Sequence, residues 1–256
     1  MEAIILAGGL GTRMREETDF RPKPMVEVGG RPVLWHILKH LSTHGVNCFV
    51  VALGYKGEMI RDYFLKDESL ASDRGWRSGY VETVKVHDED RGTPWTVTLV
   101  DTGLSTNTGG RVKQAAEFTS GSDVLMAYGD TLADVDVSGL ERHHRQSGAE
   151  VTVTAVQPIS RFGVLELAQG GRVREFVEKP RMREWVSIGH MMMSKQFIDA
   201  LPDNAVLEEQ PMAQVAATGK MYAFRHEGFW QPMDTYREYV ELNRLWDEGH
   251  PPWKTW

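Results

Sequence analysis

The sequence contains very little cysteine: Cys48 is the one cysteine among 256 residues. A single thiol cannot form an intramolecular disulfide, and a metal centre built from several cysteine ligands is excluded. Cys48 lies in the apolar run 46–53, so we expect its side chain to pack in the interior of the protein. The chain must therefore fold without covalent cross-links between its own residues.

Long apolar runs and an excess of positive charge are also absent. No apolar stretch reaches the roughly 20 residues of a membrane-spanning helix. The N-terminus enters a strand-like segment at once, without the basic and apolar regions of a cleavable signal, so we expect a cytoplasmic location. The net charge of −7 provides no basic excess for a nucleic-acid backbone. We expect neither a membrane nor a nucleic acid as partner.

What the sequence does contain is an alternation of buried strands and amphipathic helices. Apolar runs of strand length recur at 3–7, 46–53, 95–101, 123–128 and 150–156. Apolar residues with helical spacing recur at 32–41, 56–64, 109–118 and 138–146. Strands that alternate with helices favour a parallel sheet with right-handed crossovers. The sequence thus predicts an α/β fold.

The pattern changes after residue 157. Short strands are predicted at 162–167 and 173–177, joined by the turn residues Gly170 and Gly171. Further strands are predicted at 188–193, which includes a core run of three methionines, and at 220–225, and helices at 195–201, 207–217 and 235–248. No linker interrupts the chain. We therefore predict a single domain, 1–256, in which residues 158–256 elaborate a core formed by residues 1–157.

Two segments suggest contacts between subunits. Residues 66–94 are polar and rich in turn residues, and we predict an irregular excursion there that acts as a lid or a subunit contact. The chain ends on Trp253 and Trp256, and large aromatic side chains are seldom left in water. We expect both tryptophans to pack on the body of the protein or on a second subunit, and we predict a homo-oligomer.

A glycine-rich loop follows the first predicted strand. Gly8, Gly9 and Gly11 allow the backbone to approach a ligand closely, and the cations Arg13 and Lys23 follow soon after. Bare backbone N–H groups beside cations suit a phosphate group. The alternative, a loop whose glycines serve only turn geometry, does not account for the two cations. The loop therefore predicts a phosphate site.

Two better-known phosphate motifs do not fit this loop. The P-loop requires lysine and then serine or threonine after its last glycine, and the sequence has no such pair there. The dinucleotide fingerprint requires a third spaced glycine at the position of Met14. A P-loop kinase and a dinucleotide-dependent dehydrogenase are therefore disfavoured.

The sequence Leu-Ala-Gly-Gly-Leu-Gly-Thr-Arg at 6–13, with Pro-Lys-Pro-Met at 22–25, resembles the signature of the sugar-phosphate nucleotidyltransferases. The resemblance covers most of the chain and is strongest to members that use CTP and glucose 1-phosphate. Further matching segments are 16–18, 34–36, 54–57, 95–103, 108–111, 228–235 and 252–256.

The resemblance implies a fold, a reaction and a division of the chain. The fold is Rossmann-like, with a mostly parallel mixed sheet flanked by helices and a small β-containing C-terminal elaboration. The reaction is Mg²⁺-dependent transfer of a cytidylyl group from CTP to a sugar 1-phosphate. Residues 1–157 would then bind the nucleotide, and residues 158–256 would bind the sugar phosphate and form contacts in a homo-oligomer.

Such a reaction brings two polyanions together, so the protein supplies mainly position and positive charge. Arg13 suits the β- and γ-phosphate oxygens through its planar fork, and Lys23, between two prolines, suits the reacting phosphates as a point charge. We predict both as catalytic residues. The nucleotide-binding residues implied by the resemblance are Leu6, Ala7, Gly8, Gly9, Gly11, Thr12, Arg13, Lys23, Gly103, Thr108, Gly109 and Arg111. Residues 108–111 also have the pattern of a helix start, whose bare N–H groups either face an anion or simply begin a helix.

Asp130 and Asp234 are the predicted metal ligands. Mg²⁺ prefers one or two carboxylates together with phosphate oxygens and water. Asp130 follows an apolar strand, at the edge where α/β sheets bind ligands, and Asp234 lies just before a helix whose capping box starts at Thr235. The resemblance carries metal binding onto both aspartates. Lower-ranked alternatives are Asp101, Asp134 and Asp136.

The predicted substrate-binding residues are Tyr128, Glu178, Lys179, Gly189 and His190. The resemblance weakens here, because Ile188 and His190 stand where the family has asparagine and glycine, and Gln210 stands where it has glutamate. Losing an amide that faces sugar hydroxyls changes the hydrogen bonds that select the acceptor. Two alternatives therefore stay open beside glucose 1-phosphate: another sugar phosphate or small phosphorylated or phosphonate acceptor, and a catalytically silent nucleotide-sugar-binding subunit. The retained charged residues disfavour the silent subunit.

Overall fold

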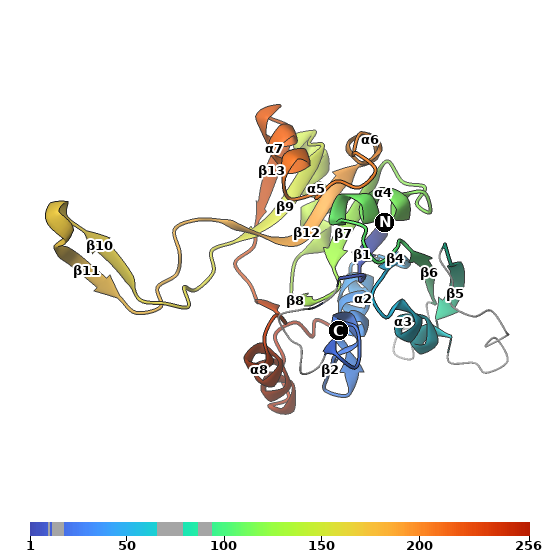
Figure 1. Ribbon diagram of the computed structural model, residues 1–256, viewed down its shortest axis with the longest axis horizontal. Helices are drawn as coiled ribbons and strands as arrows, with labels where there is room; N and C mark the ends of the chain where they lie inside the picture. The colour runs from blue at the N-terminus through green and yellow to red at the C-terminus, as the bar shows by residue number, and fades with distance from the viewer. Residues whose placement is uncertain (10, 12–17, 66–78, 87–93) are drawn as a thin grey trace.

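The computed structural model describes residues 1–9, 11, 18–65, 79–86 and 94–256. An eight-stranded sheet forms the centre of the molecule (Figure 1). In spatial order its strands are β13 (Met221–Arg225), β9 (Val151–Val156), β12 (Val186–Ser194), β7 (Asp123–Tyr128), β1 (Glu2–Leu6), β4 (Cys48–Leu53), β6 (Trp95–Asp101) and β5 (Val81–Val86). The predicted α/β fold with a mixed sheet is confirmed.

The sheet is parallel in its centre and mixed towards both edges. Strand β1 pairs in parallel with β4 and β7, and β4 pairs in parallel with β6. Strand β12 runs antiparallel to β7 and β9, β13 is parallel to β9, and β5 is antiparallel to β6. The carboxyl ends of β7, β1, β4 and β6 therefore share one edge, which is where such sheets bind ligands. Strands β12 and β13 come from beyond residue 157 and complete the same sheet.

Both faces of the sheet are buried, as the alternation along β1 illustrates. Ile5 belongs to a core that includes α2 (Val33–Thr43), α5 (Val137–Ser147) and α8 (Tyr236–Asp247). Ile4 belongs to the opposite core, which includes α4 (Thr108–Ala116), α6 (Lys195–Asp199) and α7 (Gln210–Ala217). A strand that is covered on both faces has a continuous apolar sequence, which explains why the sequence predicts β1. The short helix α3 (Gly57–Phe64) adds Ile60 to the first core.

Short elements surround the sheet. Two-residue strands β2 (Glu27–Val28) and β3 (Arg31–Pro32) form a hairpin, and β8 (Thr131–Ala133) pairs with β14 (Trp230–Pro232). The 3₁₀ turns are η1 (Lys23–Met25) and η2 (Gln169–Gly171). None of these short strands was predicted, because two or three residues carry no periodic pattern.

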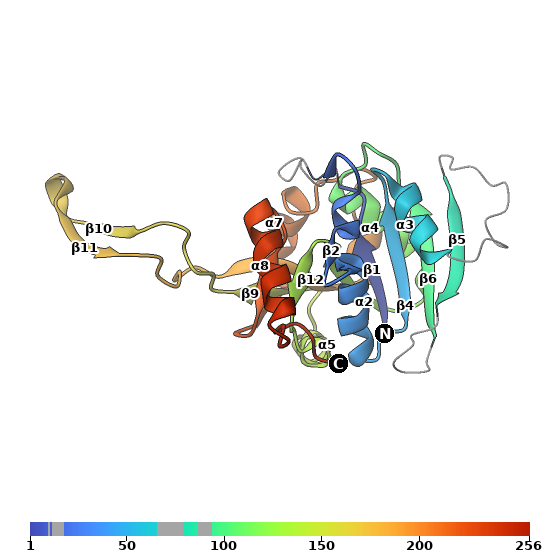
Figure 2. The same ribbon diagram turned by 90° about the horizontal axis from the view of Figure 1, so that it is seen from below.

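A two-stranded arm projects from the body in both views (Figures 1 and 2). It consists of β10 (Val164–Leu167) and β11 (Val173–Val177), joined at Gly170 and Gly171 as the turn signal predicted. Backbone pairing continues toward the body, where Ser160 N donates to Pro180 O over 2.8 Å. We call residues 158–182 the arm.

The C-terminal tail packs on the body, which confirms that prediction. The side chain of Trp253 is fully buried, and its ring contacts those of His36, Phe229 and Trp246. The ring of Trp256 stacks edge-on against Trp35 of α2. Aromatic burial of this kind anchors the chain end firmly.

Two sequence-based predictions were wrong. Cys48 is exposed, because it is the first residue of β4 and the buried part of the strand begins at the next residue. Within the predicted irregular excursion at 66–94, residues 81–86 form the regular edge strand β5, and most of the remainder lies outside the described residues. In the part of the chain that the structure describes, no helix is long and apolar enough to cross a membrane.

Candidate functional site

The backbone after β1 and β4 packs directly on a buried arginine. Arg111 Nη1 donates to Leu53 O over 2.9 Å and to Thr102 Oγ1 over 2.7 Å. A Cβ atom on Gly8 would lie 2.2 Å from that nitrogen, and one on Gly54 would lie 2.6 Å from it. Burial lowers the pKa of Arg111 from its ordinary value. The predicted nucleotide-binding residue Arg111 thus packs against the backbone of the glycine loop. Its guanidinium leaves no room for a side chain at Gly8 or Gly54.

The start of α4 is not a free anion site. Gly109 N and Gly110 N both donate to Ala205 O, over 2.9 and 3.3 Å. The hydroxyl of Thr108 accepts from Leu207 N over 2.9 Å and donates to Glu208 Oε2 over 2.6 Å. Of the two alternatives for residues 108–111, the structure favours a plain helix start, because the loop before α7 already caps the N–H groups of Gly109 and Gly110.

Other predicted nucleotide-binding residues lie at the edge of the sheet. Leu6 ends β1, Ala7 N donates to Ala52 O over 3.0 Å, and a Cβ on Gly9 would meet no atom within 4 Å. Gly11 and Gly103 both have positive φ, +63° and +88°, which favours glycine at both positions. Thr12 and Arg13 lie outside the described residues.

Lys23 lies between the two predicted metal ligands. Its Nζ donates to Asp130 Oδ2 and to Asp234 Oδ1, each over 2.5 Å. The lysine side chain is 8% exposed, and those of Asp130 and Asp234 are 30% and 19% exposed. Asp130 lies 107 positions after Lys23 in the sequence, and Asp234 lies 211 positions after it. The three residues nevertheless form one charged cluster at the ligand-binding edge of the sheet.

The pairing of β8 with β14 brings the two aspartates together. Thr131 opposes Pro232 in this antiparallel pair, and Met233 N donates to Asp130 O over 3.0 Å. Asp130 precedes β8 and Asp234 follows β14, so both carboxylates leave the same end of the ladder. The capping box of Thr235 and Glu238 then starts α8 immediately after Asp234, as predicted.

Prolines fix the position of Lys23. Pro22 precedes η1, and Met25 N donates to Pro22 O over 2.8 Å. A Cβ on Gly129 would lie 3.2 Å from Pro24 Cγ, so this proline packs against the residue before Asp130. The backbone of Lys23 is therefore held in place, and its long side chain reaches the carboxylates.

The donor set of this cluster fits Mg²⁺. Two carboxylates that converge on one cation are what Mg²⁺ takes from a protein when phosphate oxygens and water complete its octahedron. Among the described residues there is no group of three or more acidic, histidine or cysteine side chains that could hold a metal by itself. The lower-ranked aspartates have other roles: Asp101 and Asp134 accept from Gly103 N and Phe229 N, and Asp136 caps α5.

The predicted substrate-binding residues fall into a buried group and an arm group. In the buried group, a Cβ on Gly189 would lie 1.9 Å from the ring of Tyr128, so the ring packs directly against that glycine. His190 pairs with Ala127 in the sheet and is 2% exposed. Burial lowers the pKa of His190 to about 4, so its imidazole is neutral. Ile188 belongs to the core, as do the three methionines that follow His190, which confirms the core strand.

The arm group contains Glu178 and Lys179, which follow β11. Both are exposed, and Lys179 Nζ lies 3.6 Å from Glu178 Oε1. Lys179 has φ of +48°, a left-handed conformation that is uncommon outside glycine and often marks functional positions.

One residue near the site was missed from the sequence. Arg161 Nη2, in the arm next to Ser160, forms an ion pair with Glu238 Oε1. The other oxygen of that carboxylate accepts from Asp234 N over 2.8 Å. Arg161 therefore joins the arm to the metal-ligand segment, and no local sequence pattern reveals a pair so far apart.

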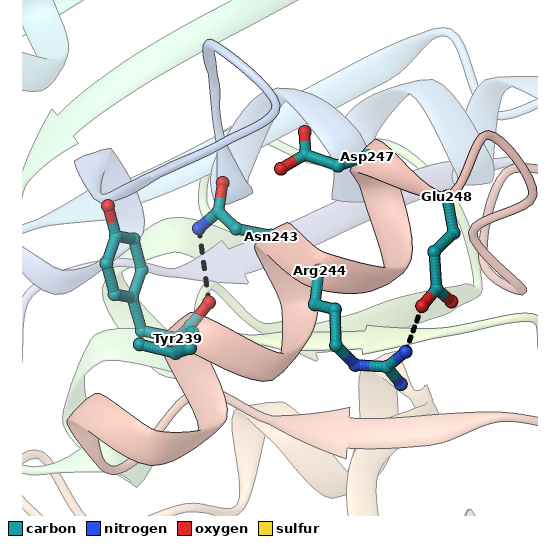
Figure 3. Close-up of a pocket in the computed structure, with 6 residues that line it drawn as sticks. Tyr239, Asn243, Arg244, Asp247 and Glu248 are labelled. Atoms are coloured by element: carbon teal, nitrogen blue, oxygen red, sulfur yellow. Dashed lines mark hydrogen bonds and ion pairs between the residues drawn. The ribbon is translucent and has the colours of Figure 1, made fainter.

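A shallow hollow of about 460 Å³ on the outer face of α8 is not this site. Figure 3 shows its lining side chains, among them Tyr239, Asn243 and Arg244, along a single helix. Asn243 donates to Tyr239 O, and Arg244 pairs with Glu248. Polar groups that satisfy one another on one helix offer no converging set for a ligand.

Known proteins resemble this chain along its full length. The family model described as nucleotidyl transferase matches residues 2–246. Glucose-1-phosphate cytidylyltransferase of Salmonella typhi is 45% identical over 100% of both chains, and a probable glucose-1-phosphate cytidylyltransferase of Bacillus subtilis is 38% identical over 100% of both. HddC from Yersinia pseudotuberculosis shares the fold, with a TM-score of 0.70 and 23% identity over 96% of this chain and 99% of that one. The chain belongs to the nucleotidyl transferase family.

Proposed function

We propose that the protein transfers a cytidylyl group from CTP to glucose 1-phosphate, giving CDP-glucose and pyrophosphate, with Mg²⁺ as cofactor. The observation that carries this proposal is the Lys23–Asp130–Asp234 cluster beside a glycine loop. It occurs in a chain that aligns over its full length, at 45% identity, with a glucose-1-phosphate cytidylyltransferase. A reaction that consumes CTP belongs in the cytoplasm, where nucleoside triphosphates are made.

The chemistry is an in-line displacement at phosphorus. A phosphate oxygen of the sugar phosphate forms a bond to the α-phosphorus of CTP, and the bond from that phosphorus to the bridging oxygen breaks as pyrophosphate leaves. Lys23 and Arg13 neutralise charge on the phosphate oxygens, and backbone N–H groups of the glycine loop position them. Asp130 and Asp234 would hold Mg²⁺, which polarises phosphate oxygens and offsets their negative charge.

The acceptor side combines a closely packed tyrosine with an exposed lysine. Tyr128 against Gly189 forms a surface fixed by close packing, and Lys179 on the arm supplies an exposed ammonium for the sugar phosphate. The Arg161–Glu238 ion pair joins the base of the arm to the segment that carries Asp234.

The difference from the family pattern at residues 188–190 does not by itself require an acceptor other than glucose 1-phosphate. Ile188 and His190 are 4% and 2% exposed, and Ile188 packs into the core. Their side chains therefore serve the interior of the sheet, and the names of the full-length relatives favour glucose 1-phosphate. A different small phosphorylated acceptor is the second candidate.

We further propose that the protein forms a homo-oligomer through the arm. Large apolar side chains are exposed along the arm and beside it: Ile159, Phe162, Val164, Leu165, Leu167, Val173, Phe176, Val177 and Trp185. Monomeric soluble proteins rarely expose so many large apolar side chains on one projecting segment, and a second copy of the chain would cover them.

A panel assay tests the function. The protein is incubated with Mg²⁺, each of the four ribonucleoside triphosphates and dTTP, and several sugar 1-phosphates, and pyrophosphate release is measured. We expect release with CTP and glucose 1-phosphate. Release with CTP that fails for glucose 1-phosphate but occurs with another acceptor would select the second candidate. No release with CTP and any acceptor would rule out both, and would favour a silent nucleotide-sugar-binding subunit.

A further inference from the structure

Lys23 occupies the position between the two carboxylates that a metal ion would need. Its ammonium lies 2.5 Å from one oxygen of Asp130 and 2.5 Å from one oxygen of Asp234. A Mg²⁺ ion bound by the same oxygens would lie at about 2.0–2.1 Å from each. The ammonium and the metal would then be within van der Waals contact, where two cations repel strongly. The two cannot hold the same oxygens together.

The backbone of Lys23 is held independently of its side chain. Pro22 and Pro24 hold the η1 turn, and Val26 N donates to Lys23 O over 3.1 Å. The four-carbon stem of lysine has several rotatable bonds, so the ammonium can turn to a new anionic partner whose charge offsets the loss of its two ion pairs. In the proposed reaction that partner is the triphosphate.

We propose that Lys23 is an internal counter-ion that keeps Asp130 and Asp234 together and lowers their affinity for a free divalent cation. The metal and the triphosphate arrive together: the metal takes the carboxylates, and the displaced ammonium takes a phosphate. This inference rests on the proposed function only for the identity of the anion that receives Lys23. The competition itself concerns the free protein and one cation.

Direct metal binding tests the competition without measuring turnover. Mn²⁺, which prefers the same oxygen ligands as Mg²⁺, is titrated into the nucleotide-free protein, and unbound Mn²⁺ is measured by electron paramagnetic resonance. We expect Lys23→Met to bind one Mn²⁺ per chain at least tenfold more tightly than the wild type. Lys23→Arg, which keeps the charge, should stay as weak as the wild type.

Three controls make the result decisive. Lys113→Met removes an ammonium that pairs with Asp203 on an exposed surface and should leave Mn²⁺ binding unchanged. Lys23→Met combined with Asp130→Asn should lose the gain, which assigns it to this pair. Lys23→Gln repeats the test with an amide if the methionine variant does not give a wild-type circular dichroism spectrum.

Equal Mn²⁺ affinity in the wild type and both Lys23 variants would overturn the proposal, as would a gain that survives Asp130→Asn. These outcomes are distinguishable from failure of the proposed function. If CTP yields pyrophosphate but Mn²⁺ affinity does not change, only the role of Lys23 as a counter-ion is wrong. If CTP yields none, the Mn²⁺ titration still decides whether lysine and metal compete.

Discussion

At the scale of single residues, the site depends on a few side chains held by their neighbours. Asp130 Oδ2 accepts from Lys23, and the residue before it, Gly129, donates its N–H to Leu6 O over 2.9 Å. The carboxylate is therefore fixed relative to β1 and the glycine loop. A residue so placed, without a core role of its own, is one whose substitution affects chemistry more than folding.

We expect Asp130→Asn to lower kcat at least 100-fold with little change in stability, because an amide is a poor ligand for Mg²⁺ and carries no charge. Steady-state pyrophosphate release and a urea unfolding curve measure the two effects. Asp203→Asn is the matched control, because Asp203 pairs with Lys113 on an exposed surface. Activity of Asp130→Asn close to that of the wild type would remove Asp130 from the metal site.

Gly189→Ala is expected to destabilise the protein by about 2–4 kcal/mol, because its Cβ would overlap the ring of Tyr128 and its φ is positive. The Cβ would lie 1.9 Å from the ring, at φ of +78°. Gly219→Ala has a similar φ of +74° with no atom within 4 Å, and should cost only about 1–2 kcal/mol. Urea denaturation compares them, and equal losses would show that the contact with Tyr128 is unimportant.

At the scale of elements, the arm exposes large apolar side chains that the single chain leaves uncovered. Among the described residues, strands β10 and β11 pair only with each other, in the hairpin that projects from the body in Figure 2. Their apolar side chains are exposed. An isolated two-stranded hairpin is marginally stable in water, so its burial against a second chain would stabilise it.

Leu167→Asp should therefore reduce the size of the assembly. Leu167 is 59% exposed, so a carboxylate there costs the free chain little but would be buried without a partner in an interface. Light scattering coupled to size-exclusion chromatography measures the mass. Val240→Asp, on the exposed face of α8, is the control and should leave the mass unchanged. A wild-type protein that is monomeric would contradict this account of the arm.

The sequence predicted those elements whose pattern is local. Strand β7, buried on both faces, was predicted with its observed bounds, Asp123–Tyr128. Strand β5 was not, because Glu82, Thr83 and Lys85 make an edge strand look like a polar loop. The ion pairs of Lys23 and of Arg161 join residues far apart in the sequence, so only the pairing of β8 with β14 and the course of the arm reveal them. The resemblance predicted the two aspartates as metal ligands, but their shared ion pair with Lys23 is seen only in the folded structure.

At the scale of the whole molecule, buried histidines couple folding to pH. Burial lowers the pKa of His36 to about 4, that of His40 to about 3 and that of His190 to about 4. His36 Nε2 and His40 Nε2 each bond a backbone carbonyl, of Val28 and Val135. The three imidazoles are thus uncharged near pH 7 and buried, two of them on α2 and one on β12 of the sheet.

Stability should fall as the pH drops below about 6.5, because the unfolded histidines take up protons that the folded ones do not. Each of the three contributes at most about 2 kcal/mol between pH 7 and pH 5. Urea unfolding curves across this range measure the slope, and His190→Met should make it shallower. A free energy of unfolding that does not change between pH 7 and pH 5 would contradict this picture of the core.

The central claim is the reaction itself, and phosphorus NMR of one mixture tests it most directly. The protein is added to CTP, glucose 1-phosphate and Mg²⁺, and the spectrum is followed over time. We predict that the triphosphate and sugar-phosphate signals decline together while the two coupled resonances of a diphosphate diester appear with one equivalent of pyrophosphate. Persistence of the CTP signals with glucose 1-phosphate unchanged would contradict the account.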